Sequence, residues 1–329
     1  MKKFRLNRRK KIAVFVAFLL VAGSVVFWLT RGGTELAQDT KQEQKFYSQL
    51  TGVEVSKEDS ELPILGVMIE NSEEARPQSG LDAAGIVFET VTEGGITRYL
   101  ALYQENKPQE VGPVRSVRPA FVDWGMGFDA SFAHVGGSAT ALQMLDDRRA
   151  KSMNEFINAN AYYRRDDRAA PHDAYARTTD LVALQREKGH GTSNVTGFPR
   201  SDDAPAPEPT ARVITLRFSH PLYHASFTYD SKTNGYARVL AGQAHVDEAT
   251  GQQITTRNLI TIEADIQAGG LGSGKATLYK DGTAHDLNWE QDSFGNRIRF
   301  TDENGNEIGL NRGDLWIAVV PINGSISVQ

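Results

Sequence analysis

The chain begins with a basic segment that is followed by an uninterrupted apolar run. Residues 2–11 contain seven lysines and arginines and no acid, and residues 12–30 carry no charged side chain. At about 1.5 Å per residue, a helix over 12–30 would be roughly 28 Å long, close to the ~30 Å hydrocarbon core of a bilayer. The pattern predicts a transmembrane helix over 12–30 and a cytoplasmic tail over 1–11, because Lys and Arg beside a span resist translocation.

A cleavable signal peptide is the alternative interpretation, because it also combines a basic start with an apolar run. The cluster Ala22-Gly23-Ser24 resembles a cleavage site, but apolar residues continue beyond it to Leu29. The next candidate cleavage site is residues 35–37. It begins with Glu35, at a position where the signal peptidase requires a small side chain. We therefore expect an uncleaved single-pass anchor in the cell membrane, with the rest of the chain extracytoplasmic.

Strand and helix patterns alternate in the first half of the exported part. Residues 31–61 are polar and predict a tether without a core. Apolar runs of strand length predict strands at 64–69, 85–91, 96–103 and 130–135. Helical spacing predicts helices at 120–126, 139–145 and 181–187, with caps at Ser138 and at Thr179 or Asp180. This mixture indicates one α+β or α/β domain over 62–197.

The pattern changes after residue 197. Residues 198–210 are rich in proline, which stiffens a chain without packing it, so we predict a linker there. Asn-Gly and Asp-Gly pairs then predict turns at 234–235, 281–282 and 304–305. The flanking segments predict hairpins of 275–279 with 283–289 and of 297–300 with 307–310, and a closing strand at 315–320. We expect a mainly β second domain over 211–329.

The composition excludes several kinds of site and argues against one class of partner. The chain has no cysteine, which excludes disulfides, thiolate zinc sites, thiol nucleophiles and a lipoprotein anchor on an acylated cysteine. The formal net charge is −5, and without the seven basic residues of the tail it is about −12. That balance argues against a nucleic-acid partner, which usually meets a basic face.

An ordered series of short motifs runs through both predicted domains. They are LTG at 50–52, MIEN at 68–71, ARPQSGL at 75–81, EGGITR at 93–98, GPVRSVRP at 112–119, HVGGS at 134–138, PHDAY at 171–175 and GDLWIAVVP at 313–321. The order of the series is far more specific than any single motif.

This series resembles the YerB-like family over residues 50–329. The resemblance implies a bacterial envelope protein with an amino-terminal and a carboxy-terminal domain of unknown function, and it implies no established activity. Two departures stand out: family members are often lipoproteins, whereas this chain lacks cysteine, and Asp173 stands where the Pro-His motif usually continues with Asn. The membrane helix would then replace the lipid anchor.

Side chains suited to binding or catalysis lie beside Gly and Pro in the first predicted domain. Guanidinium forks match phosphate or carboxylate oxygens in pairs, and the loop 112–119 presents two arginines three residues apart. The predicted ligand-binding residues are Arg76, Arg98, Arg115, Arg118, Ser138 and Tyr175. The candidate catalytic residues are Glu93, His134 and His172, because His and Glu can transfer protons near neutral pH.

Ordinary structural roles compete with each of these assignments. The arginines would form salt bridges to Glu70, Glu89, Glu93 or Asp123, the histidines would be buried and satisfied by backbone, and the Arg164–Arg168 run would be a solvated turn. A metal site of His134, His172 and Glu93 is chemically permissible, but no ligand spacing supports it, so we predict no metal and no cofactor. Ser116 and Ser138 lack a G-x-S-x-G elbow.

Three functions fit the sequence. The first is a module that binds an anionic cell-envelope polymer in an Arg/His cleft of the first domain. The second is a hydrolase or transferase acting on an envelope phosphodiester or glycan, with His134 or His172 as acid/base and Arg115 and Arg118 stabilising charge. The third is a scaffold for other envelope proteins.

Overall fold

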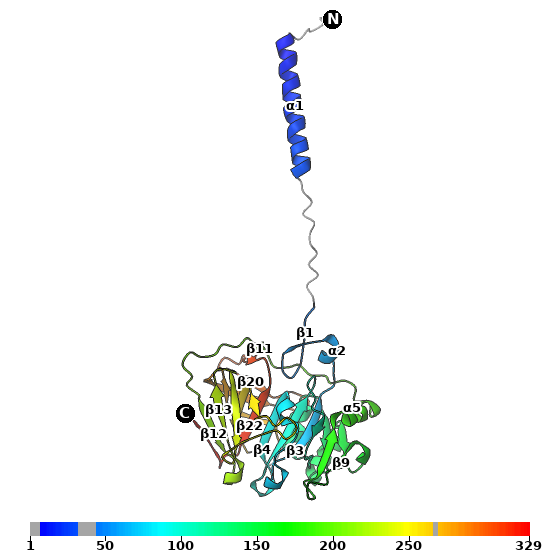
Figure 1. The fold of residues 1–329 in the computed structure, drawn as a ribbon, viewed down its shortest axis with the longest axis vertical. Helices are drawn as coiled ribbons and strands as arrows, with labels where there is room; N and C mark the ends of the chain where they lie inside the picture. The colour runs from blue at the N-terminus through cyan, green and yellow to red at the C-terminus, as the bar shows by residue number, and fades with distance from the viewer. Residues whose placement is uncertain (1–6, 32–43, 266–268) are drawn as a thin grey trace. The chain divides into compact units, whose positions relative to one another are not determined.

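The computed structural model describes residues 7–31, 44–265 and 269–329 (Figure 1). In the first of these segments, the predicted span 12–30 falls within helix α1 (Arg8–Arg31). Judged by length together with mean hydropathy, no helix in the described part of the chain qualifies to cross a membrane. The single-pass topology stays a prediction, and residues 1–6 of the basic tail and 32–43 of the tether lie outside the described residues.

The tether prediction is wrong for residues 45–61, which belong to the folded body that starts at Lys45. Strand β1 (Phe46–Tyr47) pairs with β2 (Glu54–Val55), and helix α2 (Lys57–Ser60) follows. Leu50 is fully buried, and the backbone N–H of Gln49 donates to the side chain of Gln104 over 2.8 Å. One buried leucine and side-chain hydrogen bonds hold a segment that is polar on average, which is why its composition suggested a tether.

A ten-stranded sheet forms the centre of the described body. Its order is β20 (Arg299–Thr301), β19 (Thr283–Gln291), β18 (Gly272–Lys280), β17 (Asn258–Glu263), β22 (Leu315–Val320), β4 (Ile86–Val91), β5 (Thr97–Tyr103), β3 (Leu65–Glu70), β7 (Ser131–His134) and β8 (Ser152–Asn154). Strand β22 pairs in parallel with β17 on one side and with β4 on the other, and Figure 1 shows it in red beside cyan β4. The two predicted halves of the chain therefore share one sheet.

A six-stranded sheet covers one face of the central sheet. Among the described residues it comprises β15 (Gln243–Ala244), β14 (Gly235–Leu240), β13 (His224–Asp230), β12 (Val213–Arg217) and β23 (Ser325–Val328) in that order, with β16 (Thr255–Thr256) also on β14. Smaller pairings join β6 (Glu110–Val111), β10 (Ala174–Arg177) and β9 (Tyr163–Arg164), and join β11 (Arg200–Ser201) with β21 (Leu310–Asn311).

Side chains that alternate between the two faces of the central strands form two hydrophobic cores. On β4, Val87 packs with the six-stranded sheet, whereas Phe88 packs with helices on the opposite face, because successive strand residues point to opposite sides. The helices are α3 (Pro119–Met126), α4 (Ala139–Asp147) and α5 (Thr178–Glu187), with 3₁₀ turns η1 (Glu73–Ala75), η2 (Leu81–Ala83), η3 (Glu93–Gly95), η4 (Ala159–Ala161) and η5 (Pro221–Tyr223). The described part of the chain is mainly β, with less helix than the α+β or α/β expectation for the first domain.

Most predicted elements are confirmed to within a few residues. Ser138 caps α4 by accepting a hydrogen bond from Ala141 N, as expected, whereas α5 begins after Arg177 rather than at the predicted caps. The predicted hairpin of 297–300 with 307–310 is confirmed only in part: Thr301 and Glu307 form an isolated antiparallel bridge, and the N–H of Ile308 donates to the carbonyl of Phe300 over 3.3 Å. Strand β20 pairs with β19, and β21 pairs with β11, a strand supplied by the segment predicted as a linker. That segment also buries Phe198.

A fully buried ion pair joins the two sheets. Arg238 on β14 and Glu89 on β4 are both inaccessible to solvent, and Nη2 of Arg238 donates to both Glu89 carboxylate oxygens over 2.7 and 2.8 Å. The indole of Trp316 on β22 donates to Glu89 Oε2 over 3.0 Å, and its ring lies 4.7 Å from the guanidinium carbon. Burial lowers the pKa of Arg238, but Glu89 and Tyr99 together outweigh it and raise the pKa overall, so Arg238 stays charged.

Removing one member of this pair should be far more harmful than replacing both. We expect Glu89→Ala to lower the free energy of unfolding by about 3–5 kcal/mol, because Arg238 is left buried without a counter-charge. The double variant Glu89→Leu/Arg238→Met should recover most of that loss. Urea denaturation followed by circular dichroism measures both. A Glu89→Ala protein within about 1 kcal/mol of the parent would contradict the assignment.

Candidate functional site

Glu70, at the end of β3, connects two of the predicted site residues. Its side chain is 4% exposed, and its carboxylate lies 3.2 Å from Nε of Arg115 and 3.0 Å from Nδ1 of His172. The hydroxyl of Ser72 lies 3.2 Å from the same ring nitrogen. Three chain segments that are distant in sequence therefore meet at one buried carboxylate. The carboxylate partner of His172 is Glu70 and not Glu93.

Arg98 lies directly across from Glu70 in the pairing of β5 with β3. It is 6% exposed and donates through Nη1 to the carbonyl of Ser116 over 2.8 Å, while its Nε has no hydrogen-bond partner within the described residues. Burial, and next the charge of Arg118, lower the pKa of Arg98 to about 10, although Glu70 and Glu93 oppose the shift. Three arginines thus share two glutamates, which leaves an excess of positive charge.

Arg118 and Glu93 lie at the edge of this arginine cluster, which we define as Arg98, Arg115 and Arg118. They form an ion pair between a side chain that is 20% exposed and one that is 62% exposed. Partial burial raises the pKa of Glu93, but the hydrogen bond from Arg118, a backbone hydrogen bond and the charges of Arg118 and Arg98 together outweigh it and lower the pKa below its ordinary value. Glu93 lies in η3 beside Gly94, which adopts a positive φ of 68°.

A cavity of about 240 Å³ opens at this ion pair, and we call it the Arg118 cavity. Its walls are the end of β4, the first turn of α3 and the first turn of α4, represented by Thr92, Ala120 and Thr140. Arg118 is the N-cap of α3, and no side chain caps that helix. N–H groups at a helix start attract anions, and the first residues of α3, Pro119, Ala120 and Phe121, line the same cavity as Arg118.

Ser138 also lines the Arg118 cavity, while its hydroxyl caps α4. The other predicted residues, His134, Arg76 and Tyr175, lie apart from this cavity and make structural contacts. His134 is fully buried, with Nδ1 2.7 Å from the carbonyl of Gly136 and Nε2 2.9 Å from the hydroxyl of Ser152, and burial lowers its pKa. Both ring nitrogens are occupied, which fits the satisfied histidine weighed above. Arg76 donates to the carbonyls of Asn71 and Leu222 over 3.0 and 2.9 Å.

Tyr175 is fully buried beneath Arg165, whose guanidinium carbon lies 4.7 Å from the ring centre. Arg165 also forms an ion pair of 2.9 Å with Glu248 in the carboxy-terminal half. Arg168 donates to the carbonyl of Pro77 over 3.0 Å. Asp166 and Asp167 lie in an exposed turn, as expected, whereas Arg165 and Arg168 form ion pairs with Glu248 in the carboxy-terminal half.

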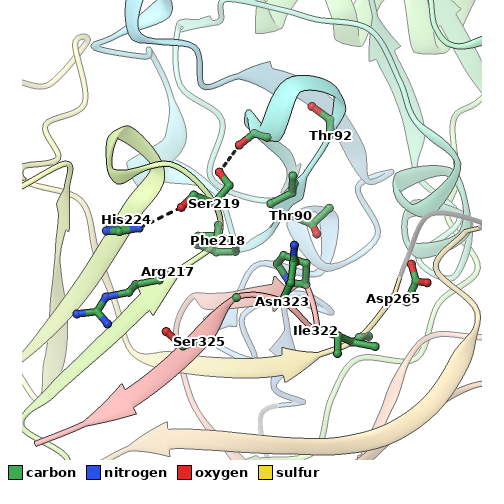
Figure 2. Close-up of a pocket in the computed structure, with 15 residues that line it drawn as sticks. Thr90, Thr92, Arg217, Phe218, Ser219, His224, Asp265, Ile322, Asn323 and Ser325 are labelled. Carbon is green, nitrogen blue, oxygen red and sulfur yellow. Dashed lines mark hydrogen bonds between the residues drawn. The ribbon is translucent and has the colours of Figure 1, made fainter.

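A second, larger cavity of about 850 Å³ lies where the two sheets approach each other, and we call it the polar cavity (Figure 2). Sequence analysis did not identify it, because its walls come from short segments of both halves, at 90–95, 217–224, 264–265 and 321–325. One feature of the sequence pointed to this region: the expected strand 315–320 stops at Pro321. As for metals, no group of three or more His, Asp or Glu side chains within the described ranges is placed to hold an ion.

Comparisons with known proteins agree with the motif series. Models of the N-terminal and C-terminal domains of a protein of unknown function, DUF3048, match residues 50–191 and 214–317. The chain is 30% identical over 303 residues to a protein of Bacillus subtilis (strain 168) named "Putative lipoprotein YerB", covering 87% of this chain and 89% of that protein.

A solved structure agrees as well. The crystal structure of YerB from Bacillus subtilis matches with a TM-score of 0.76 and 29% identity, over 86% of this chain and all of that one. The resemblance to YerB-like proteins is therefore confirmed, and so is a two-domain, mainly β architecture. The chain belongs to the DUF3048 family, together with YerB.

Proposed function

We propose that this protein is an envelope binding protein whose Arg118 cavity holds an anionic group, a phosphate or a carboxylate, of a cell-envelope polymer. One observation carries the proposal: Arg118, one of three arginines that share two glutamates, lines a cavity that the first residues of α3 and α4 also line. The volume of about 240 Å³ equals roughly eight water molecules at ~30 Å³ each, enough for a small charged group.

Glu93 has the properties of a counter-ion that a ligand can displace. Its side chain is largely exposed, whereas the partner guanidinium of Arg118 is mostly covered. When Glu93 leaves, its carboxylate returns to water at little cost, and the incoming anion gains Arg118 together with the N–H groups of α3. The more deeply buried Glu70 stays with Arg115 and His172.

The name of the Bacillus relative supports a location at the membrane surface. This chain has no cysteine to carry a lipid, but residues 12–30 are uncharged and follow seven basic residues. We propose that this segment anchors the protein in the place of a lipid, with the DUF3048 domains outside the cell membrane. A polymer of the envelope would then be within reach of the Arg118 cavity.

A hydrolase or transferase is the second candidate, and His172 favours it. A carboxylate holds its Nδ1 at 3.0 Å, an arrangement that prepares the other ring nitrogen for proton transfer. Turnover of a phosphodiester polymer that His172→Ala abolishes, while binding persists, would select this candidate. Intact polymer after prolonged incubation with the parent protein would count against it.

Charge changes at the ion pair should alter anion binding in opposite directions. We expect Arg118→Ala to weaken the binding of inorganic phosphate about tenfold or more, and Glu93→Gln to strengthen it, because the first removes the ligand's partner and the second removes its competitor. Isothermal titration calorimetry on residues 45–329, the compact folded body, measures both. Affinity should also fall as salt rises.

The matched control is Arg299→Ala, which removes an exposed arginine from the edge strand β20. It should bind phosphate as the parent does. Equal weakening by Arg299→Ala and Arg118→Ala would show that the protein attracts anions only through its overall charge. Weaker binding by Glu93→Gln would contradict the displacement of Glu93.

The anchor predicts a definite topology. Protease added to wall-stripped cells should digest the folded body that starts at Lys45, and an antibody to the carboxy terminus reports the loss directly. Replacing Val16 and Leu20 by Arg should release the protein from the membrane fraction, because charges at the centre of a span cost about 3 kcal/mol each. Protection of the body in wall-stripped cells, with cleavage only after lysis, would overturn the proposed location.

A further inference from the structure

The polar cavity is built by four segments that the fold brings together, one of which is the residue pair 264–265 after β17. Thr90 and Thr92 come from the end of β4, Ser219 and His224 from the connection of β12 with β13, and Asn323 from the turn between β22 and β23 (Figure 2). The hydroxyl of Ser219 donates to the carbonyl of Gly95, which ties the carboxy-terminal half to η3. The imidazole of His224 lies 3.2 Å from the carbonyl of Ser219.

The lining of the polar cavity differs in chemistry from that of the Arg118 cavity. Neutral hydroxyl and amide groups come from Thr90, Thr92, Ser219, Asn323 and Ser325, and Arg217, His224 and Asp265 add side chains that can carry charge. Apolar surface stands between them, including Ile322, whose side chain is 70% exposed. Neutral hydrogen-bonding groups interleaved with aliphatic surface suit a ligand that offers hydroxyls at its edges and C–H groups on its faces, as a sugar ring does.

The aromatic content of the lining argues against a nucleotide. Bases are held by stacking on exposed aromatic rings. The phenyl ring in this lining, Phe218, is only 1% exposed and forms part of the core behind the cavity. A volume of about 850 Å³ falls in the range of ~300–1,000 Å³ that is usual for sites of small organic ligands, and it is large enough for more than one sugar ring.

The two cavities share a wall. Thr90, Val91 and Thr92 line both of them, so both open beside the same strand end. A ligand that crosses this strand end can place a charged group next to Arg118 and neutral rings beside Asn323. A chain of sugars with anionic substituents has that combination of groups.

We infer that the polar cavity is a carbohydrate subsite, and that the ligand of this protein is an anionic glycan whose sugar rings occupy the polar cavity while one of its charged groups occupies the Arg118 cavity. The inference rests on the proposed function for the charged group, but the sugar subsite has its own residues. The two parts of the site can therefore be tested separately.

Three probes distinguish binding of the charged group from binding of the sugar rings: tetragalacturonate, its fully methyl-esterified form and inorganic phosphate. The variant Asn323→Trp fills the polar cavity from an exposed turn position, and Asn160→Trp, at an exposed position in η4, is its matched control. We expect Asn323→Trp to weaken tetragalacturonate about tenfold or more and to leave phosphate unchanged, whereas Asn160→Trp changes neither. The neutral ester should bind weakly, and its binding should be sensitive to Asn323→Trp and not to Arg118→Ala.

The outcomes distinguish the two claims. Equal affinity of the parent and Asn323→Trp for tetragalacturonate, or no binding of tetragalacturonate at all, overturns the carbohydrate subsite even if phosphate still requires Arg118. Binding of the ester that Asn323→Trp abolishes, with phosphate binding absent, supports the subsite and overturns the anion site. A loss of affinity for both tetragalacturonate and phosphate in Asn323→Trp overturns the separation of the two cavities.

Discussion

The buried pair of Glu89 and Arg238 is the contact on which the rest of the body depends. It places opposite charges of two sheets in contact inside an apolar core, where a shift of either sheet would leave a charge unpaired. The pair also holds β4 in place, and the site follows from the position of this strand. The three residues after Glu89 line both cavities, and the next one, Glu93, is the exposed counter-ion of Arg118. This continuity explains how a site between distant segments can have a defined geometry.

Local patterns predicted the elements well and their partners poorly. The run 315–320 was identified as a strand because it is continuously apolar, as a strand buried on both faces must be. Its place between β17 and β4 depends on contacts across more than 200 residues, which periodicity does not contain. Residues 45–61 were mispredicted for a different reason. This segment is held mainly by hydrogen bonds, so a count of its apolar residues alone suggests a tether.

The candidate site was predicted in part, for related reasons. Arginines beside proline and glycine indicated an anion site, and Arg98, Arg115 and Arg118 do gather, with Glu93 beside them. His134 has the same local signature, a Gly-rich turn before a helix, yet it lies in the core with both nitrogens bonded. Residue type and turn context cannot distinguish a side chain that faces a cavity from one that faces the core. The polar cavity carries no motif, since threonine, serine and asparagine occur throughout the chain.

In the proposed function, an anion takes the place of Glu93 on Arg118. A crystal structure of the body in complex with a phosphate-bearing ligand would show this exchange. We expect density for the anion between the Arg118 guanidinium and the first turn of α3, with the Glu93 carboxylate turned into solvent and Glu70 still in contact with Arg115. An anion bound elsewhere, with Glu93 still paired to Arg118, would contradict it.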